Sequence, residues 1–268
     1  MSPTRNANDT DVLARPLSPR SVIASLLLGM HPPRLRGALL VRWCAHLGIA
    51  QGTTRVALSR MVDAGELIAV DGRYELAGPL RTRQAGQDWS LAPVLLPWDG
   101  DWALWIVHPG RRPAPRRAEL RHAASAGRLV ELRDGAWGRP DNLPPEATSS
   151  AATAILEAQA SRWTAHPTPR DEPDVVELFG LAPMADRMVR LLSQLGPLTA
   201  ELRAGDLSRL GPGFALGAAT LQQIRRDPLL PASLAGRSWP GAALRSAYGR
   251  YQLAFSEAVR AWFATASP

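Results

Sequence analysis

Lysine is absent from this sequence of 268 residues, and all 31 of its basic residues are therefore arginines. A GC-rich genome produces the same bias, so the absence alone does not identify a ligand. The formal net charge of +7 remains, however, and it favours a polyanionic partner such as nucleic acid. Arginine suits such a partner because its planar guanidinium donates two hydrogen bonds at once to phosphate or guanine.

The chain also lacks disulfide pairs and long apolar runs. Its one cysteine, Cys44, excludes an intrachain disulfide and fits a reducing cytosol. The apolar run from Val22 to Met30 is interrupted by Ser25 and Gly29, and it is far shorter than the ~20 residues that span a bilayer. No small-residue cleavage pattern follows it. We therefore expect a cytoplasmic protein without a membrane contact.

Motifs of enzymatic chemistry are missing as well. The five histidines show no metal-ligand spacing with one another or with Cys44, and no GxSxG, P-loop or GxGxxG stretch occurs. Cys44 lies in an apolar helix pattern that suits a core thiol better than a nucleophile. Asp99 and Asp101 flank a turn before a strand and leave a metal-dependent nuclease as an alternative. We expect no enzymatic activity, no metal and no cofactor.

Residues 18–80 carry the pattern of a winged helix-turn-helix. Helix-start signals and apolar spacing predict three helices, over 18–29, 37–47 and 53–64. Two β-prone runs follow, Leu67–Val70 and Arg73–Leu76, and Asp71-Gly72 between them is a strong hairpin signal. Three helices and a hairpin in this order predict a DNA-binding domain. Residues 1–17 are polar and without a period, and predict a disordered arm.

Helical periodicity divides the third helix into two faces. The inward face holds Thr54, Ala57, Leu58, Met61 and Val62. The outward face holds Arg55, Val56, Ser59 and Arg60. In a helix-turn-helix the outward face meets base edges in the major groove, and Arg55 is the candidate for a guanine contact. Small residues at the start of this helix allow its backbone amides to approach a phosphate.

The candidate DNA-binding residues come from the third helix, the segment around the second helix and the hairpin. They are Arg34, Arg36, Arg42, Thr53, Thr54, Arg55, Ser59, Arg60, Arg73 and Tyr74. Alternatives stay open for single members, because an exposed arginine is often only solvated, Thr53 suits a helix N-cap and Tyr74 suits hairpin packing. The ordered set of elements therefore carries the prediction.

The rest of the chain predicts a linker and two further domains. Residues 81–91 are polar and suit a linker, and 92–182 show the strand and helix order of a ferredoxin-like split βαβ domain. Its elements are expected at 102–107, 114–126, 129–133, 136–138, 147–162 and 175–179. Residues 183–268 predict a helical domain for dimerisation or effector binding, with a final apolar-striped helix from about Pro240. The expected fold class is α+β.

Three stretches of the chain stand in the order found in one known family. They are "TTRVALSRMVDAGEL", then "WDGDWALWIV" with "GRLVELRDGAWGRP", and finally "IRRDPLLPASLAGRSWPGAALRSAYGRY". Together they resemble the PaaX-type family of phenylacetate-catabolism repressors. The resemblance implies a dimeric repressor built of the three domains above, whose founding members release DNA on binding phenylacetyl-CoA. It carries the DNA role to Thr53, Thr54, Arg55, Ser59 and Arg60, and it assigns no effector-binding residue.

The sequence therefore predicts a homodimeric, cytoplasmic and nucleoid-associated transcriptional regulator that binds an operator in double-stranded DNA. We expect a repressor that an acyl- or aryl-CoA-type metabolite releases. One alternative is a non-enzymatic scaffold or assembly protein, held together by the aromatic stripe of the final helix. A hydrolase or nuclease built on the ferredoxin-like domain is the other alternative.

Overall fold

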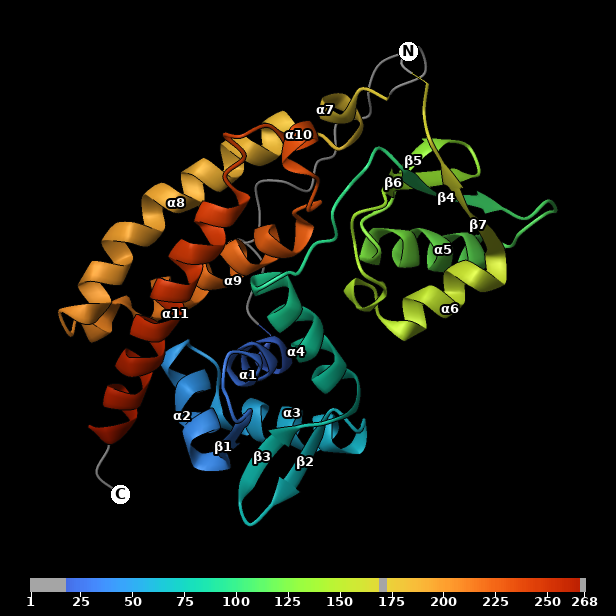
Figure 1. Cartoon of the computed structure of the whole chain (residues 1–268). Coiled ribbons are helices and arrows are strands. Elements are labelled where there is room, and N and C mark those ends of the chain that lie inside the picture. Colours follow the sequence, from blue (N-terminus) through green and yellow to red (C-terminus); the bar gives the residue numbers. More distant parts are fainter. Residues whose placement is uncertain (1–17, 169–172, 266–268) are drawn as a thin grey trace. The chain divides into compact units, whose positions relative to one another are not determined.

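The structure is a computed structural model that describes residues 18–168 and 173–265, so the expected arm at 1–17 lies outside the described residues. The fold is α+β with two antiparallel sheets (Figure 1). The chain forms two compact units, and each is assembled from separate stretches of sequence. Within the described residues, the first unit comprises 18–85, 193–222 and 246–265. The second comprises 86–168, 173–192 and 223–245.

This division differs from the three consecutive domains expected from the sequence. Four helices supply residues to both units: α4 (Gly78–Leu91), α8 (Leu181–Arg203), α9 (Leu210–Arg226) and α11 (Gly241–Ala264). In this division the C-terminal residues are shared between the two units. They complete the two units that the N-terminal and central residues begin.

The first unit begins with three helices and a three-stranded sheet. Its elements are α1 (Pro19–Leu28), β1 (Arg34–Arg36), α2 (Gly37–His46), α3 (Gln51–Asp63), β2 (Leu67–Val70) and β3 (Arg73–Leu76). Ser18 caps α1 by accepting a hydrogen bond from the Ser21 amide at 3.1 Å, as its position before proline predicts. The predicted hairpin is confirmed. Asp71 and Gly72 both have positive φ, the conformation of a tight two-residue turn.

The strand β1 was not predicted, because three residues between a proline and a glycine carry no periodic signal. It pairs antiparallel with β3, which gives the sheet order β1-β3-β2. The pairing places Leu35 opposite Tyr74, and both side chains are half-buried. β1 thereby fixes the hairpin to the chain that leads into α2.

Helix α4 replaces the linker that the polar sequence at 81–91 predicts. Its inward side includes the buried Leu80 and the buried amide of Gln84. Gln84 Nε2 donates to the carbonyl oxygens of Leu28 and Met30 at 3.2 and 3.1 Å, and so satisfies acceptors at the end of α1. The polar sequence did not indicate this helix, because a polar residue occupies a buried position, where hydrophobic periodicity cannot detect it.

The core of the first unit joins α2 to the C-terminal helices. Trp43 is fully buried, and its ring centroid lies 5.6 Å from that of Phe214 on α9. On α11, the centroids of Phe255 and Trp262 lie 6.1 and 5.8 Å from Trp43, in near-perpendicular contacts. Edge-to-face aromatic pairs of this kind stabilise a core beyond their buried area. The aromatic stripe of the final helix therefore serves the core of its own unit.

The second unit contains a four-stranded sheet with two helices on one face (Figure 1). Its elements are β4 (Trp102–Val107), α5 (Ala114–Ala126), β5 (Val130–Arg133), β6 (Ala136–Pro140), a 3-10 turn (Pro145–Ala147), α6 (Ser150–Gln159) and β7 (Ala160–Ala165). The strand order is β5-β6-β4-β7, and all neighbours are antiparallel. Trp105 and Leu120 are among the buried residues packed between the sheet and the helices.

The last strand lies earlier than the sequence predicts. We expected it at 175–179, but β7 follows α6 directly and pairs with β4, with Trp163 opposite Leu104. Val175–Leu178 instead forms the short helix α7, because Asp174 Oδ1 accepts from the amides of Val176 and Glu177 at 3.0 and 3.1 Å. Residues 175–179 are apolar except for Glu177, and so short a segment does not distinguish a strand from a helical turn by periodicity.

The "RRDP" and "WPG" stretches meet at a buried carboxylate in the second unit, beside the short helix α10 (Ala232–Ala235). Asp227 accepts hydrogen bonds from Arg245 Nη2 at 2.5 Å, and from Trp239 Nε1 and the Leu229 amide at 3.1 Å each. Buried charges require such partners. This network gives the motif a structural role in the second unit. A second 3-10 turn, Leu207–Arg209, precedes α9 in the first unit.

Candidate nucleic-acid interface

Helix α3 presents the outward face that its sequence pattern predicts. Thr54, Leu58 and Met61 are buried against the rest of the first unit. The outward residues Arg55, Val56, Ser59 and Arg60 are all exposed. Within the described part of the chain, neither Arg55 nor Arg60 has a hydrogen-bond or ion-pair partner. Both guanidinium groups are therefore available to another molecule.

The start of α3 is also open. The helix begins at Gln51, two residues before the predicted start, and the N-cap residue Ala50 provides no side-chain hydrogen bond. Thr53 consequently lies inside the first turn and is not the N-cap. The first amides of a helix have no acceptor within the helix itself. Gly52 and Thr53 are exposed here, so the first turn can offer these amides to a ligand.

Thr54 is a correction to the predicted site. Its side chain is fully buried, and its hydroxyl donates to the Ala50 carbonyl at 3.3 Å. A residue that points into the core cannot contact DNA while the helix is folded. The periodicity of α3 already assigned Thr54 to the inward face, and that assignment was the correct one.

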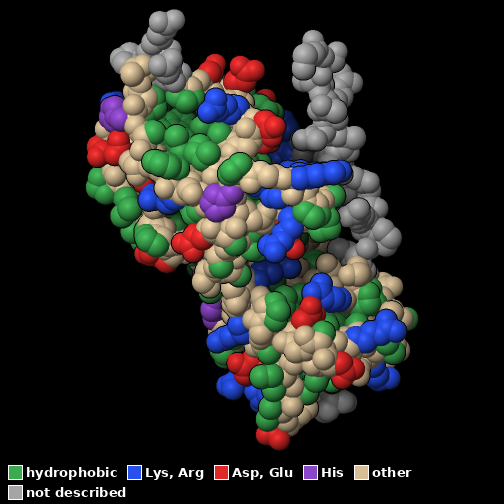
Figure 2. Space-filling view, turned by 90° about the vertical axis from the view of Figure 1, so that its right-hand side faces the viewer, with side chains coloured by type: hydrophobic (Ala, Val, Ile, Leu, Met, Phe, Trp, Pro, Cys, Tyr) green, Lys and Arg blue, Asp and Glu red, His purple; other side chains and the backbone are tan. Residues whose placement is uncertain are grey.

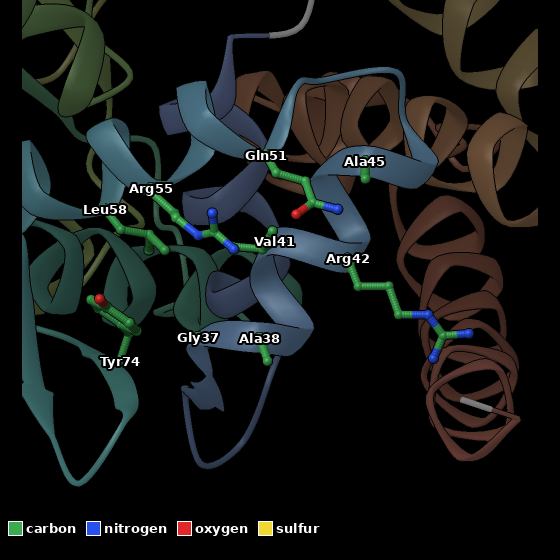
Figure 3. A pocket seen from close by; sticks show the side chains of 9 residues that line it. All are labelled: Gly37, Ala38, Val41, Arg42, Ala45, Gln51, Arg55, Leu58 and Tyr74. Atoms are coloured by element: carbon green, nitrogen blue, oxygen red, sulfur yellow. The ribbon is translucent and has the colours of Figure 1, made fainter. Parts of the chain in front are cut away.

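A groove with a volume of about 550 Å³ runs along α3 (Figure 3). Its walls come from α2, α3 and β3. The lining residues are Gly37, Ala38, Val41, Arg42, Ala45, Gln51, Arg55, Leu58 and Tyr74. Figure 3 shows the Arg55 guanidinium between the apolar side chains of Leu58 and Val41, with the Gln51 amide higher in the view. The groove therefore combines an apolar floor with free hydrogen-bonding groups at its edge.

Tyr74 owes its position in this groove to a glycine. A Cβ atom added to Gly37 would lie 2.8 Å from the Tyr74 ring, so only glycine permits this close packing. The Gly37 amide also donates to the Gly72 carbonyl at 2.9 Å, which ties the start of α2 to the hairpin turn. Tyr74 thus packs in the hairpin, which is the alternative to a DNA contact given for it in the sequence analysis. It also lines the groove.

Arg42 is the second correction. Its guanidinium lies over the ring of Trp262, 4.1 Å from the centroid, and Nη1 donates to the Phe263 carbonyl at 3.4 Å. Figure 3 shows the side chain directed away from Arg55. Arg42 therefore lines the groove with its stem and attaches α2 to the end of α11 with its charged head. We no longer assign it a phosphate contact.

Three arginines of the sheet, Arg34 and Arg36 on β1 and Arg73 on β3, lie on the opposite face from Tyr74, because side chains alternate along a strand. Arg34, Arg36 and Arg73 are exposed. The register places Arg36 opposite Arg73, and Arg34 opposite Glu75. Among the described residues, none of the three arginines has an ion-pair partner. The structure therefore divides the predicted site between the α3 groove and the outer face of the sheet.

The charge on the surface is mixed. Figure 2 shows arginines and acidic side chains interspersed over the visible face, without one large basic patch. Near the candidate residues, Asp63 and Asp71 are exposed acids. Acidic side chains among the arginines weaken the long-range attraction of a polyanion to this surface. They leave short-range hydrogen bonding by each guanidinium intact. The free guanidinium groups of α3 thus matter more than the net charge.

Gln51 is the residue that sequence analysis missed. We placed it in the turn before the third helix, whereas it is the first residue of α3, exposed and at the edge of the groove. Gly48, with φ of 81°, ends the preceding helix and marks where a new one can begin. That signal, combined with the four-residue spacing to Arg55, could have included Gln51 in the predicted site.

The remaining chemical candidates in the sequence are Cys44 and the side chains that could bind a metal. Cys44 is fully buried, and burial raises the pKa of its thiol, as expected for a core cysteine. In the ranges 18–168 and 173–265, no group of three His, Cys, Asp or Glu side chains is placed to hold a metal ion. None of the helices in these ranges is both long and apolar enough to cross a membrane.

The N-terminal residues thus define a small α+β unit that presents one helix and an adjacent hairpin with free guanidinium groups. A family model described as PaaX-like protein matches residues 18–79. The solved structure described as "Uncharacterized protein Rv0674 from Mycobacterium tuberculosis" is 34% identical, over 91% of this chain and 98% of that chain, with a TM-score of 0.68. A comparison with curated proteins finds no match. The chain belongs to the PaaX-like family, and this membership indicates a transcription regulator.

Proposed function

We propose that the protein is a sequence-specific, double-stranded DNA-binding transcription regulator whose N-terminal residues form a winged helix-turn-helix. The element order α1-β1-α2-α3-β2-β3 and the sheet order β1-β3-β2 support this assignment. In this arrangement α3 is the recognition helix and the β2–β3 hairpin is the wing. The match to the PaaX-like family covers the same residues.

The observation that carries the proposal is the free outward face of α3. Arg55 and Arg60 are exposed and without partners in the described chain, and Ser59 lies between them. A guanidinium fork matches O6 and N7 of guanine, and a serine hydroxyl donates to either kind of base. Arg34, Arg36 and Arg73 on the sheet and the open first turn of α3 are the proposed phosphate contacts.

The family resemblance extends the proposal to repression and its relief. The protein acts as a homodimer in the cytoplasm, on two operator half-sites ~34 Å apart. An acyl- or aryl-CoA-type metabolite releases it by favouring a second conformation, in which the two recognition helices no longer match the half-sites. The strand order β5-β6-β4-β7 supports a ferredoxin-like fold for the sheet of the second unit. The protein works by binding and needs no cofactor.

The proposal is tested with duplex fragments selected from the genome of the source organism. The full chain should retain specific fragments, and a defined operator should bind with an affinity that falls as salt rises. Arg55→Ala should reduce the preference for the operator over other duplexes. Arg116→Ala, which removes an exposed arginine from α5, should leave this preference unchanged. Binding that depends on neither salt nor sequence would refute a regulator, and an unchanged affinity with every CoA thioester would refute the proposed release.

A further inference from the structure

Two free polar side chains lie at the edge of the α3 groove, one helical turn apart. Gln51 and Arg55 are four residues apart on the same face of the helix, and both line the groove. Both are exposed, and in the described chain neither has a hydrogen-bond or ion-pair partner. Nothing in the first unit therefore requires an amide at Gln51 or a guanidinium at Arg55.

The two side chains differ in what they can recognise. The glutamine amide has a donor and an acceptor side by side, which match N7 and N6 of adenine in the major groove. The guanidinium has two parallel donors, which match O6 and N7 of guanine. Four residues of helix correspond to a rise of about 6 Å, close to two base-pair steps of about 3.4 Å each.

We infer that Gln51 is a specificity-determining residue that reads an adenine, while Arg55 reads a guanine about two base pairs away. This inference rests on the proposed DNA-binding function and assigns bases to that same site. The N-terminal residues of a recognition helix contact base edges. Gln51 is the first residue of α3, so its amide lies where base edges come within reach.

A glutamate substitution tests the inference because it changes the base that is recognised. The carboxylate keeps the length of the glutamine side chain but can only accept hydrogen bonds, and it pairs with the amino group of cytosine. In selections from a duplex pool randomised over the half-site, the wild-type chain should enrich adenine at one position. Gln51→Glu should replace that adenine by cytosine, and Gln51→Ala should leave the position without preference.

The size of the effect and a matched control make the result decisive. One bidentate pair discriminates bases by about 5- to 150-fold, so the loss at that position should fall in this range. The guanine assigned to Arg55 should stay enriched in both variants. Gln222→Glu introduces the same charge at an exposed position of α9 and should leave every base preference unchanged.

The possible outcomes distinguish a failure of the adenine assignment from a failure of the proposed DNA-binding function. If both Gln51 variants bind duplex with the wild-type base preferences, the assignment of adenine to Gln51 is overturned while DNA binding stands. If adenine is lost and the guanine is lost with it, the two residues do not read separate bases, and the inference also fails. If the wild-type chain enriches no sequence at all, the proposed function itself fails.

Discussion

Arg36 and Arg73 lie directly opposite each other on the antiparallel strands β1 and β3. Both side chains are exposed and lie on the outer face of the sheet, beside the turn at Asp71 and Gly72. Like charges in this arrangement destabilise a sheet by about 0.2–1 kcal/mol. A pair without an acidic partner in the described chain fits the phosphate contact proposed for these two arginines.

The first prediction follows from this pair. Replacing Arg73 by Ser removes the repulsion, so the free energy of unfolding at low salt should stay the same or rise by up to about 1 kcal/mol. Operator binding should weaken, and the slope of log affinity against log salt should fall by about one, because one phosphate contact is lost. Urea unfolding and fluorescence anisotropy at several salt concentrations measure the two effects.

The control for this prediction is Arg116→Ser on α5, an exposed arginine in the second unit. It changes the net charge equally and should leave the salt slope as it is in the wild-type chain. A variant of Arg73 that keeps the full slope would show that the hairpin does not contact phosphate. The proposed phosphate contacts would then be reduced to Arg34 and Arg36 on β1 and the first turn of α3.

The second prediction concerns Gly52, in the first turn of α3. Its backbone is helical, and a Cβ atom there would meet nothing within 4 Å, so the fold itself does not need a glycine. Gly52→Ala should stabilise the protein by about 0.5–1 kcal/mol, the usual gain in a helix. It should also weaken operator binding, because the added methyl group keeps the phosphate away from the exposed amides.

Gly249→Ala is the matched control, because this glycine lies in α11 and also has open space around its Cβ position. It should give a similar rise in the melting temperature with an unchanged operator affinity. If Gly52→Ala stabilises the chain and binds the operator as tightly as before, the first turn of α3 does not bind a phosphate.

Sequence patterns predicted the elements of the first unit correctly where the residues that decide the structure lie close together in the sequence. The capping signal of α1, the two faces of α3 and the turn at Asp71-Gly72 are confirmed, since each depends on residues a few positions apart. The predictions failed where the decisive partner is distant in sequence. Gln84 is buried because it satisfies carbonyls at the end of α1, and no periodic pattern reports such a bond.

The same limit applies to the candidate site. The exposed face of α3 could be derived from its own spacing, and so could the inward position of Thr54. That Arg42 is held by Trp262, more than two hundred residues later, could not be derived, because no local pattern relates residues so far apart in the sequence. The groove also depends on Gly37 and Tyr74, which only the pairing of β1 with β3 brings together.

The third prediction tests whether the end of α11 stabilises α2 in the first unit. Trp262 contacts the ring of Trp43 and lies under the guanidinium of Arg42. Trp262→Ala should lower the free energy of unfolding by about 2–3 kcal/mol, somewhat less than for a fully buried tryptophan because Trp262 is half-buried. Trp262→Phe should recover most of this loss. A Trp262→Ala chain with wild-type stability would show that residues 18–85 fold without the C-terminal helix.

The fourth prediction concerns acid and the ion pair between Arg20 at the start of α1 and Glu66 after α3. Arg20 Nε donates to Glu66 Oε2 at 2.8 Å and Nη2 donates to Oε1, so the contact is bidentate. The hydrogen bond from Arg20 lowers the pKa of Glu66 below its ordinary value. A lowered folded-state pKa means that the pair stabilises the fold fully above the unfolded-state pKa of about 4.3, and less as the pH falls through the folded-state value.

Glu66→Gln should therefore reduce the free energy of unfolding by about 1 kcal/mol near neutral pH. The difference from the wild-type chain should shrink as the pH drops below about 4, because protonation of the wild-type carboxyl removes the same interaction. Urea unfolding at several pH values between 7 and 3 measures this convergence. Glu257→Gln, at an exposed position of α11, should show no such pH-dependent difference. The free energies of unfolding of the Glu66 variant and the wild-type chain could instead differ by the same amount down to pH 3. This result would mean that the carboxylate charge does not hold α1 to the end of α3.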